Sequence, residues 1–318
     1  MHRVGFIVPH GFQMMSVAAL TVFEIANMPP AGPRYEVQML SAQGGVVRSS
    51  GGMALMTDAF GDAAYDTVIV GSTTEMEIPT PDQATVAFVR QAATASRRVA
   101  SICSGAFVLA AAGLLDGRRA TMHWAHAANF RVRFPDVRTE EDRIFINDGP
   151  VWTSAGMTAG IDLVLALIDH DLGPDTAKLI ARLLVMHERR LGGQKQHSAM
   201  LDLTPRSDRI ELVLTHIRRN LRNALTIEEL AEVANLSPRQ FSRAFLAETG
   251  QSPAKAVEQL RLETARFMLE EGRHAIGVVA RETGFAHRER MRRTFLRIFG
   301  VPPEALRRPP RAQGVKAI

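Results

Sequence analysis

The one cysteine of the chain, Cys103, stands where a nucleophile or a ligand-binding thiol could act. The apolar run Val99 to Ile102 predicts a buried strand before it, and Ser104 to Phe107 predicts the start of a helix after it. Such a strand-to-helix turn, with small residues that permit a sharp bend, has the form of a nucleophile elbow. The thiol would then lie at the carboxyl edge of a sheet near the positive end of a helix, which lowers a thiol pKa. A small buried thiol that only fills a gap in the core is the alternative.

Catalysis at Cys103 would need a base near the thiol and a third group that orients the base. His123 is the candidate base, although it could equally hydrogen-bond a ligand or the Trp124 backbone. The other histidines show no spacing that specifies a metal site. A single cysteine excludes an intrachain disulfide and a cysteine-based zinc site, and suits a reducing compartment.

Alternating strand-like and helix-like runs surround this turn. The predicted strands cover residues 4–8, 35–40, 68–70 and 98–102, and the predicted helices cover 14–27, 85–95, 157–171 and 175–190. Strands separated by helices of this length imply a parallel sheet covered on both faces. Asp148-Gly149, between two strand-like runs, predicts a hairpin.

The last third of the chain contains a degenerate repeat in two copies. Leu230 recurs as Val279 after 49 residues, and Phe241 recurs as Met291 after 50. Each copy has the pattern of a short helix, a tight turn and a second helix, which is typical of two linked helix-turn-helix units. Between them, residues 253–271 predict one long helix that would hold the two reading helices about one DNA turn, roughly 34 Å, apart.

The first copy carries clear helix-start signals. Thr226 with Glu229 predicts a capping box, and Ser237 with Gln240 predicts a second one. The side chains expected to point inward in the two copies are those of Ile227, Leu230, Ala231, Ala234, Phe241, Ala244, Phe245, Met291, Phe295 and Ile298.

Positive charge is concentrated in the same region. Residues 204–318 hold 21 Lys+Arg and 13 Asp+Glu, whereas residues 1–203 hold 17 and 20. Almost all of the surplus is arginine, which can bind phosphate or guanine through two parallel hydrogen bonds. An arginine-rich solvated helix face is the alternative for the charge alone. Together with the repeat and the caps, the charge favours binding of double-stranded DNA.

Residues about 208–308 resemble the DNA-binding domain of the AraC/XylS family of transcription regulators. The segments that carry the resemblance are Leu230-Ala231, residues 241–245, Gly284-Phe285, residues 293–295 and residues 299–303. The resemblance implies that one major groove is faced by Arg239, Ser242 and Arg243. It implies that the next groove is faced by Arg288, Glu289, Arg292 and Arg293. The charged run at residues 286–290 departs from the family pattern.

Residues 1–190 resemble the DJ-1/PfpI superfamily, which is related to class I glutamine amidotransferase domains. The resemblance rests on residues 4–8, 68–71, 101–106, 117–121, 123–124 and 153–156. It implies an α/β fold with a flavodoxin-like sandwich, followed here by an all-α domain with two helix-turn-helix motifs. The order of the two domains looks like the GlxA-type branch of AraC regulators, whose members are similar to sensors of small nitrogenous metabolites such as arginine, glycine betaine or carnitine.

The resemblance also bears on catalysis. Hydrolytic relatives often place a histidine directly after the nucleophilic cysteine, where this chain has Ser104. Relatives with a redox-sensitive cysteine keep a glutamate in the first strand-to-helix loop, where this chain has residues 10–13 without an acid. We therefore expect no catalytic residue, no metal and no cofactor. The expected contacts of a small-molecule effector are Gly71, Ser72, Cys103, Ser104 and His123. A Cys103-dependent amidase or deglycase, or a redox sensor, fused to a DNA-binding domain is the alternative.

The expected organisation is a ligand-sensing domain at 1–191, a linker at 192–207, a DNA-binding domain at 208–308 and a tail at 309–318. No apolar run reaches the length of a membrane span, about 20 residues. The N-terminus leads directly into a strand without a signal peptide. We expect a cytoplasmic regulator without membrane contact, an activator that works with RNA polymerase, and a homodimer on repeated half-sites.

Overall fold

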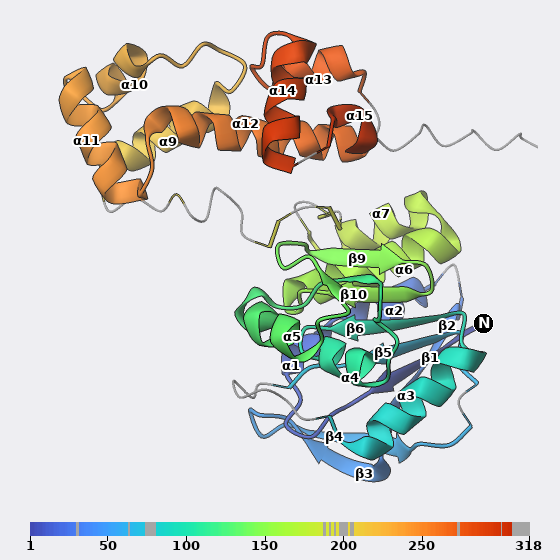
Figure 1. Cartoon of the computed structure of the whole chain (residues 1–318). Coiled ribbons are helices and arrows are strands. Elements are labelled where there is room, and N and C mark those ends of the chain that lie inside the picture. Colours follow the sequence, from blue (N-terminus) through green and yellow to red (C-terminus); the bar gives the residue numbers. More distant parts are fainter. Residues whose placement is uncertain are drawn as a thin grey trace, which may run out of the picture. The chain divides into compact units, whose positions relative to one another are not determined.

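The computed structural model describes residues 1–29, 32–62, 64–73, 81–186, 189–190, 192–193, 195–196, 203, 207–271, 274–299 and 301–306. The chain forms two compact units, Met1–Gln196 and His197–Ile318 (Figure 1). Most of the expected linker and all of the expected tail at 309–318 lie outside the described residues.

The first unit is built on an eight-stranded sheet. Its strands are β1 (His2–Ile7), β2 (Tyr35–Ser41), β3 (Gln43–Arg48), β4 (Ala54–Ala59), β5 (Thr67–Val70), β6 (Arg98–Ile102), β9 (Phe145–Asp148) and β10 (Val151–Ser154). They lie in the order β3-β4-β2-β1-β5-β6-β10-β9. The six inner strands are parallel, and the edge strands β3 and β9 are antiparallel to their neighbours. A small parallel pair joins β7 (Arg119–Ala120) to β8 (Arg138–Thr139).

Helices cover both faces of this sheet, as the alternation of strands and helices predicts (Figure 1). One face carries α1 (Met14–Ala18), α2 (Thr21–Ala26), α6 (Thr158–Leu172) and α7 (Pro174–Leu183). The other face carries α3 (Gln83–Ala95), α4 (Gly105–Ala111) and α5 (Ala127–Arg133), the last preceded by the short helix η1 (Trp124–His126). Strand β5 explains the pattern, because Ile69 packs into the first core while Val68 and Val70 pack into the second.

Two predicted helices differ from the structure. The helix predicted over 14–27 is two helices, and the Thr21 hydroxyl donates to the Ala18 carbonyl at the break. The helix predicted over 175–190 ends at Leu183, because Val185 adopts a φ of 55°, which a right-handed helix cannot continue through. Residues 187 and 188 of that predicted helix lie outside the described residues.

The second unit is helical. Its helices are α9 (Asp208–Arg219), α10 (Ile227–Val233), α11 (Pro238–Thr249), α12 (Pro253–Glu271), α13 (Ile276–Glu282), α14 (Arg288–Phe299) and α15 (Pro303–Leu306). The predicted spacer helix is confirmed as α12 with the predicted bounds. Leu260 of α12 packs into the core around α9–α11, and Leu262 and Leu269 pack into the core around α13–α15.

The capping box predicted at Ser237 and Gln240 is confirmed, with both reciprocal bonds present. At α10 only half of the predicted box forms. The Thr226 hydroxyl accepts from the Glu229 amide, but Glu229 Oε1 lies 2.8 Å from His216 Nε2 of α9 instead of capping.

Two side chains predicted to point inward are exposed. Ile227 is 39% exposed. Leu225, the residue before the Thr226 cap, takes the core position expected for Ile227 and packs in the same core as Leu230, as in a hydrophobic staple. Ile298 is 47% exposed because Phe299, one residue further along α14, packs edge-on against Phe295 and completes the apolar face.

Candidate functional site

The turn at Cys103 has the strained geometry of a nucleophile elbow. Cys103 follows β6 with a φ of 54°, and its amide donates to the Ser154 carbonyl over 3.0 Å. Gly156 makes this close packing possible, since a Cβ on Gly156 would lie 2.2 Å from the Cys103 Cβ. A Cβ on Gly105 would lie 2.5 Å from the Val70 carbonyl oxygen, so α4 also begins in contact with β5. Gly105 and Gly156, on two different segments, therefore permit the close packing that defines the bend.

Burial raises the pKa of the Cys103 thiol to about 11, although hydrogen bonds from the backbone amides of Ser104 and His123 act to lower it. The expectation of a lowered pKa was wrong. The thiol is only 2% exposed, and the cost of placing a thiolate in that environment outweighs the short helix α4. At neutral pH the thiol is protonated and is a poor nucleophile.

The elbow follows β6, one strand away from the point between β1 and β5 where the strand order of the sheet reverses. Strand β1 pairs with β2 on one side and with β5 on the other, and β5 pairs in turn with β6. In open α/β sheets, ligands bind outside the carboxyl ends of strands at such a switch point.

Of the five predicted effector contacts, Gly71 and Ser72 follow β5, Cys103 and Ser104 follow β6, and His123 follows β7. Several of their polar groups form hydrogen bonds within the protein. The Gly71 amide donates to the Ile7 carbonyl over 3.0 Å. The Ser72 hydroxyl donates to Gln13 Oε1 over 3.0 Å, and the Ser104 hydroxyl accepts from the Thr73 amide over 3.0 Å.

These bonds tie the loop after β5 to the loop after β1 and to the elbow. Gln13, which belongs to the first strand-to-helix loop, is the contact that sequence reasoning missed. No residue pattern links it to Ser72, 59 positions away.

His123 and Trp124 form the rim beside the elbow. His123 caps η1, where its Nδ1 accepts from the Ala125 amide over 3.3 Å. The contact of His123 with the Cys103 thiol is made by its backbone amide. Trp124 is 53% exposed and its ring centroid lies 5.5 Å from that of His123. An exposed aromatic side chain at this edge offers apolar surface to a small molecule.

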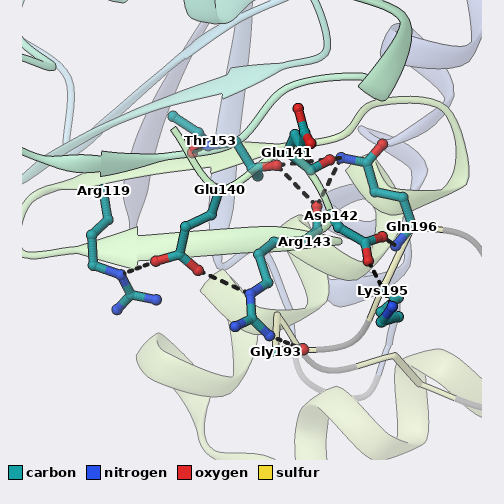
Figure 2. Close-up of polar contacts among 10 residues, drawn as sticks. Arg119, Glu140, Glu141, Asp142, Arg143, Thr153, Gly193, Lys195 and Gln196 are labelled. Atoms are coloured by element: carbon teal, nitrogen blue, oxygen red, sulfur yellow. Dashed lines mark hydrogen bonds and ion pairs between the residues drawn. The ribbon is translucent and has the colours of Figure 1, made fainter. Parts of the chain in front are cut away.

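Figure 2 shows a polar cluster centred on Glu140 and Arg143. Glu140 accepts from Arg119 Nε over 2.6 Å and from Arg143 Nε over 2.9 Å. Burial acts to raise the pKa of Glu140, but the hydrogen bonds of the two arginines outweigh it and hold that pKa below its ordinary value. Arg143 Nη1 also donates to the Gly193 carbonyl over 2.6 Å, so the cluster binds the end of the first unit.

On the helical unit, α11 presents its predicted reading face to solvent. Arg239 and Arg243 are exposed, and within the described ranges neither side chain forms an ion pair. The Ser242 side chain is half-buried, and its hydroxyl donates to the Pro238 carbonyl over 2.9 Å.

The second candidate reading helix, α14, is more highly charged. Arg288, Glu289, Arg292 and Arg293 are all exposed. Arg292 Nη1 lies 3.9 Å from Glu289 Oε1, and Arg288 Nη2 lies 3.8 Å from Glu304 Oε1. Exposed pairs at these distances contribute little to stability, so the arginines can exchange them for phosphate or base contacts.

A buried arginine joins the two halves of this unit. Arg261 of α12 is 7% exposed, and its guanidinium donates to the carbonyls of Leu221 and Asn223 in the loop before α10. Gly284, in the turn of the second helix-turn-helix, packs against the same loop, since a Cβ on Gly284 would lie 2.0 Å from the Leu221 carbonyl oxygen. The turn of one motif therefore contacts the entry loop of the other.

Within the part of the chain that the structure describes, no three His, Cys, Asp or Glu side chains are grouped to hold a metal ion. The described helices include none that is long and apolar enough to cross a membrane.

Comparison with known proteins places both units. Residues 2–170 match the DJ-1/PfpI family, and residues 230–309 match a helix-turn-helix domain. The chain is 30% identical to the HTH-type transcriptional regulator GlxA of Rhizobium meliloti over 96% of its own length and 95% of the relative's. It is 43% identical over 101 residues to an isonitrile hydratase of Pseudomonas putida, covering 31% of this chain and 42% of that one. An AraC family transcriptional regulator from Pseudomonas putida shares the fold, with 23% identity over 58% of this chain and 100% of that one and a TM-score of 0.53.

The fold and the matches define a sheet domain of DJ-1/PfpI type joined to a DNA-binding helical domain. The chain belongs to the transcriptional regulators that combine a DJ-1/PfpI domain with an AraC-type helix-turn-helix domain. It is a DNA-binding regulator of transcription, as the charge and the repeat predict.

Proposed function

We propose that this regulator responds to a small metabolite, nitrogenous in character, bound at the carboxyl edge of β5 and β6 beside Cys103, and that its N-terminal domain binds the metabolite without turning it over. The observation that carries the proposal is the state of the elbow: the strained turn is kept, while burial raises the pKa of its thiol to about 11. A protonated, buried thiol can pack against a ligand but attacks it poorly. The same burial disfavours oxidation, and so disfavours a redox sensor.

A thermal-shift screen of the full chain tests this proposal. Both tryptophans, Trp124 and Trp152, belong to the first unit, so tryptophan fluorescence reports its unfolding specifically. We expect a shift with one class among amino acids, betaines, polyamines and small amides, with the compound recovered chemically unchanged. Turnover that Cys103→Ala abolishes would favour an amidase, deglycase or isonitrile-hydrating enzyme instead.

The DNA contacts are part of the same proposal. Arg239, Ser242 and Arg243 would face one major groove, and Arg288, Glu289, Arg292 and Arg293 the next. The exposure of the six charged side chains supports this assignment. The Ser242 hydroxyl, which donates within its own helix, is the weakest member and would contact DNA by packing or as an acceptor.

The test uses an operator selected from random DNA with the wild-type protein. Arg243→Ala should cost about 1–3 kcal/mol of binding and relax the preference at one base position. Arg219→Ala, an exposed arginine at the end of α9, is the matched control. A loss that is equal for all sequences would assign Arg243 to a phosphate instead of a base.

Two linked helix-turn-helix motifs in each chain are compatible with a homodimer on repeated half-sites. We propose that this dimer activates transcription through RNA polymerase. Light scattering of the protein with and without the selected operator tests the dimer. A monomer in both samples would contradict it.

A further inference from the structure

The last described residues of the first unit are bonded to the loop before β9, as Figure 2 shows for Gly193, Lys195 and Gln196. Gln196 is also bonded to the backbone of Met122 and Trp124. We call Gly192, Gly193, Lys195 and Gln196 the exit segment, because the chain leaves the sheet domain through them. A Cβ on Gly192 would lie 2.4 Å from the Phe145 carbonyl oxygen, so the backbone runs directly against β9. Arg143 donates to the Gly193 carbonyl, and Lys195 Nζ lies 3.2 Å from Asp142 Oδ2.

Gln196 makes the most specific of these contacts. Its Nε2 donates to the carbonyls of Met122 and Glu141, both over 2.7 Å, and its Oε1 accepts from the Trp124 amide over 3.0 Å. Its own backbone amide donates to Asp142 Oδ1 over 3.1 Å. A primary amide has two N–H donors and one oxygen acceptor, and here backbone groups satisfy both kinds. Glutamate lacks the donors, and asparagine is one methylene shorter.

The same backbone stretch contacts the thiol. Met122 and Trp124 hold the Gln196 side chain, and the amide of His123 between them hydrogen-bonds the Cys103 thiol. A molecule that takes the His123 amide away from the thiol must therefore move the peptide groups that hold Gln196. An acceptor oxygen, such as that of a carboxylate or an amide, is the group that the Ser104 and His123 amides would bind.

We propose that Gln196 is a latch through which occupancy of the Cys103 site controls release of the exit segment, an inference that rests on the ligand-sensing function proposed above. The two states are the docked segment and the released segment. A bound molecule shifts the balance only if it prefers one of them, and the coupling is reciprocal. Release of the latch must then change access to Cys103, and modification of Cys103 must change the hold on the exit segment.

The single cysteine makes this testable without the metabolite. Iodoacetamide alkylates Cys103 alone, and trypsin cleavage of the Lys195–Gln196 bond, followed by mass spectrometry, reports release of the exit segment. We expect Gln196→Ala to raise both rates in the full chain by at least fivefold, roughly the change in opening equilibrium that loss of one of its side-chain hydrogen bonds would produce. Gln196→Glu should do the same, because its carboxylate would face the Met122 and Glu141 carbonyls. Gln91→Ala, an exposed glutamine of α3, is the control and should change neither rate.

The reciprocal measurement uses wild-type protein alkylated at Cys103, whose Lys195–Gln196 bond should be cleaved faster than in the unmodified protein. Cleavage of the denatured variants calibrates the intrinsic rate at each sequence. Equal alkylation rates in Gln196→Ala and Gln91→Ala, or equal cleavage of modified and unmodified wild type, would overturn the latch. Neither readout depends on a metabolite, so a thermal-shift screen without hits would count against the sensor and leave the latch standing.

Discussion

Arg261 offers the sharpest test of how the two DNA-binding motifs are held together. Its guanidinium reaches from α12 to the carbonyls of Leu221 and Asn223, against which Gly284 also packs. We expect Arg261→Met to destabilise the helical unit and to change the relative placement of α11 and α14, because methionine keeps the apolar stem but removes every donor.

The magnitude follows from the two acceptors. A hydrogen bond from a charged group contributes about 1.5–3 kcal/mol. Asn223 is exposed, so water can replace the bond to its carbonyl, whereas Leu221 is half-buried and pressed against Gly284. Burial, and then the nearby charge of Arg290, lower the pKa of Arg261, so part of the gain is offset by the cost of holding a cation there. The expected net loss is about 2 kcal/mol, close to one bond of this kind.

Far-ultraviolet circular dichroism during urea unfolding of the full chain is the assay, because both tryptophans lie in the other unit. Lys255→Met, an exposed cation of the same helix, is the matched control. Arg261→Met should also weaken binding to the selected two-part operator more than binding to a duplex carrying one half of it. If the unfolding midpoint of the helical transition and the ratio of the two affinities both equal those of Lys255→Met, Arg261 does not fix the placement of the motifs.

Two further predictions concern the sheet domain, and tryptophan fluorescence during urea unfolding checks both. Gly156→Ala should destabilise it by about 3 kcal/mol, because a side chain at a φ of 87° is strained and its Cβ would lie 2.2 Å from that of Cys103. Cys103→Gly in the same chain should recover part of that loss, and no recovery would show that the contact is unimportant. Asp171, whose side chain is fully buried, accepts from Arg98, Arg97 and Tyr35, and Asp171→Asn should cost about 3 kcal/mol at pH 7. Burial acts to raise the pKa of Asp171, but the Arg98 hydrogen bonds and charge outweigh it and hold that pKa below its usual range. The stabilisation is therefore complete above the unfolded pKa of about 3.9 and is lost as the pH falls through the lower folded pKa. The difference in unfolding free energy between wild type and Asp171→Asn should be constant from about pH 5 to 8 and should shrink below about pH 4. A difference that persists unchanged in acid would contradict this account.

The sequence predicts the helical unit closely because its signals are local. Ser237-Pro238 begins α11 through a cap and a ring that fixes φ, and Gly250 ends it in the left-handed conformation. Residues 253–271 form the predicted spacer helix, and the arginines of α11 and α14 are exposed where periodicity places them. These features depend on neighbours within one or two helical turns, which a single sequence contains.

The candidate effector site was predictable in position but not in chemistry. The elbow at Cys103 follows from a strand, a helix and small residues adjacent in sequence. Its thiol pKa is decided by burial under segments far along the chain, including Gly156, and burial reverses the direction expected from the helix terminus. The hydroxyl of Ser72 was a plausible ligand group until the fold brought Gln13 to it.

By itself the sequence determined the two kinds of domain, the parallel sheet and the two reading helices. Hydrophobic periodicity, helix caps and charge are properties of residues close together in sequence, so a single sequence contains them. Only the tertiary structure decided which polar groups form hydrogen bonds within the protein and which remain available to a ligand or DNA. Gln196, in a glycine-rich stretch with few apolar neighbours, and Arg261, one arginine among many, carry no distinguishing local signal. Their roles arise because folding sets each of them against unpaired backbone carbonyls about 40 to 75 positions away in the chain, and a buried carbonyl must find a donor wherever the fold provides one.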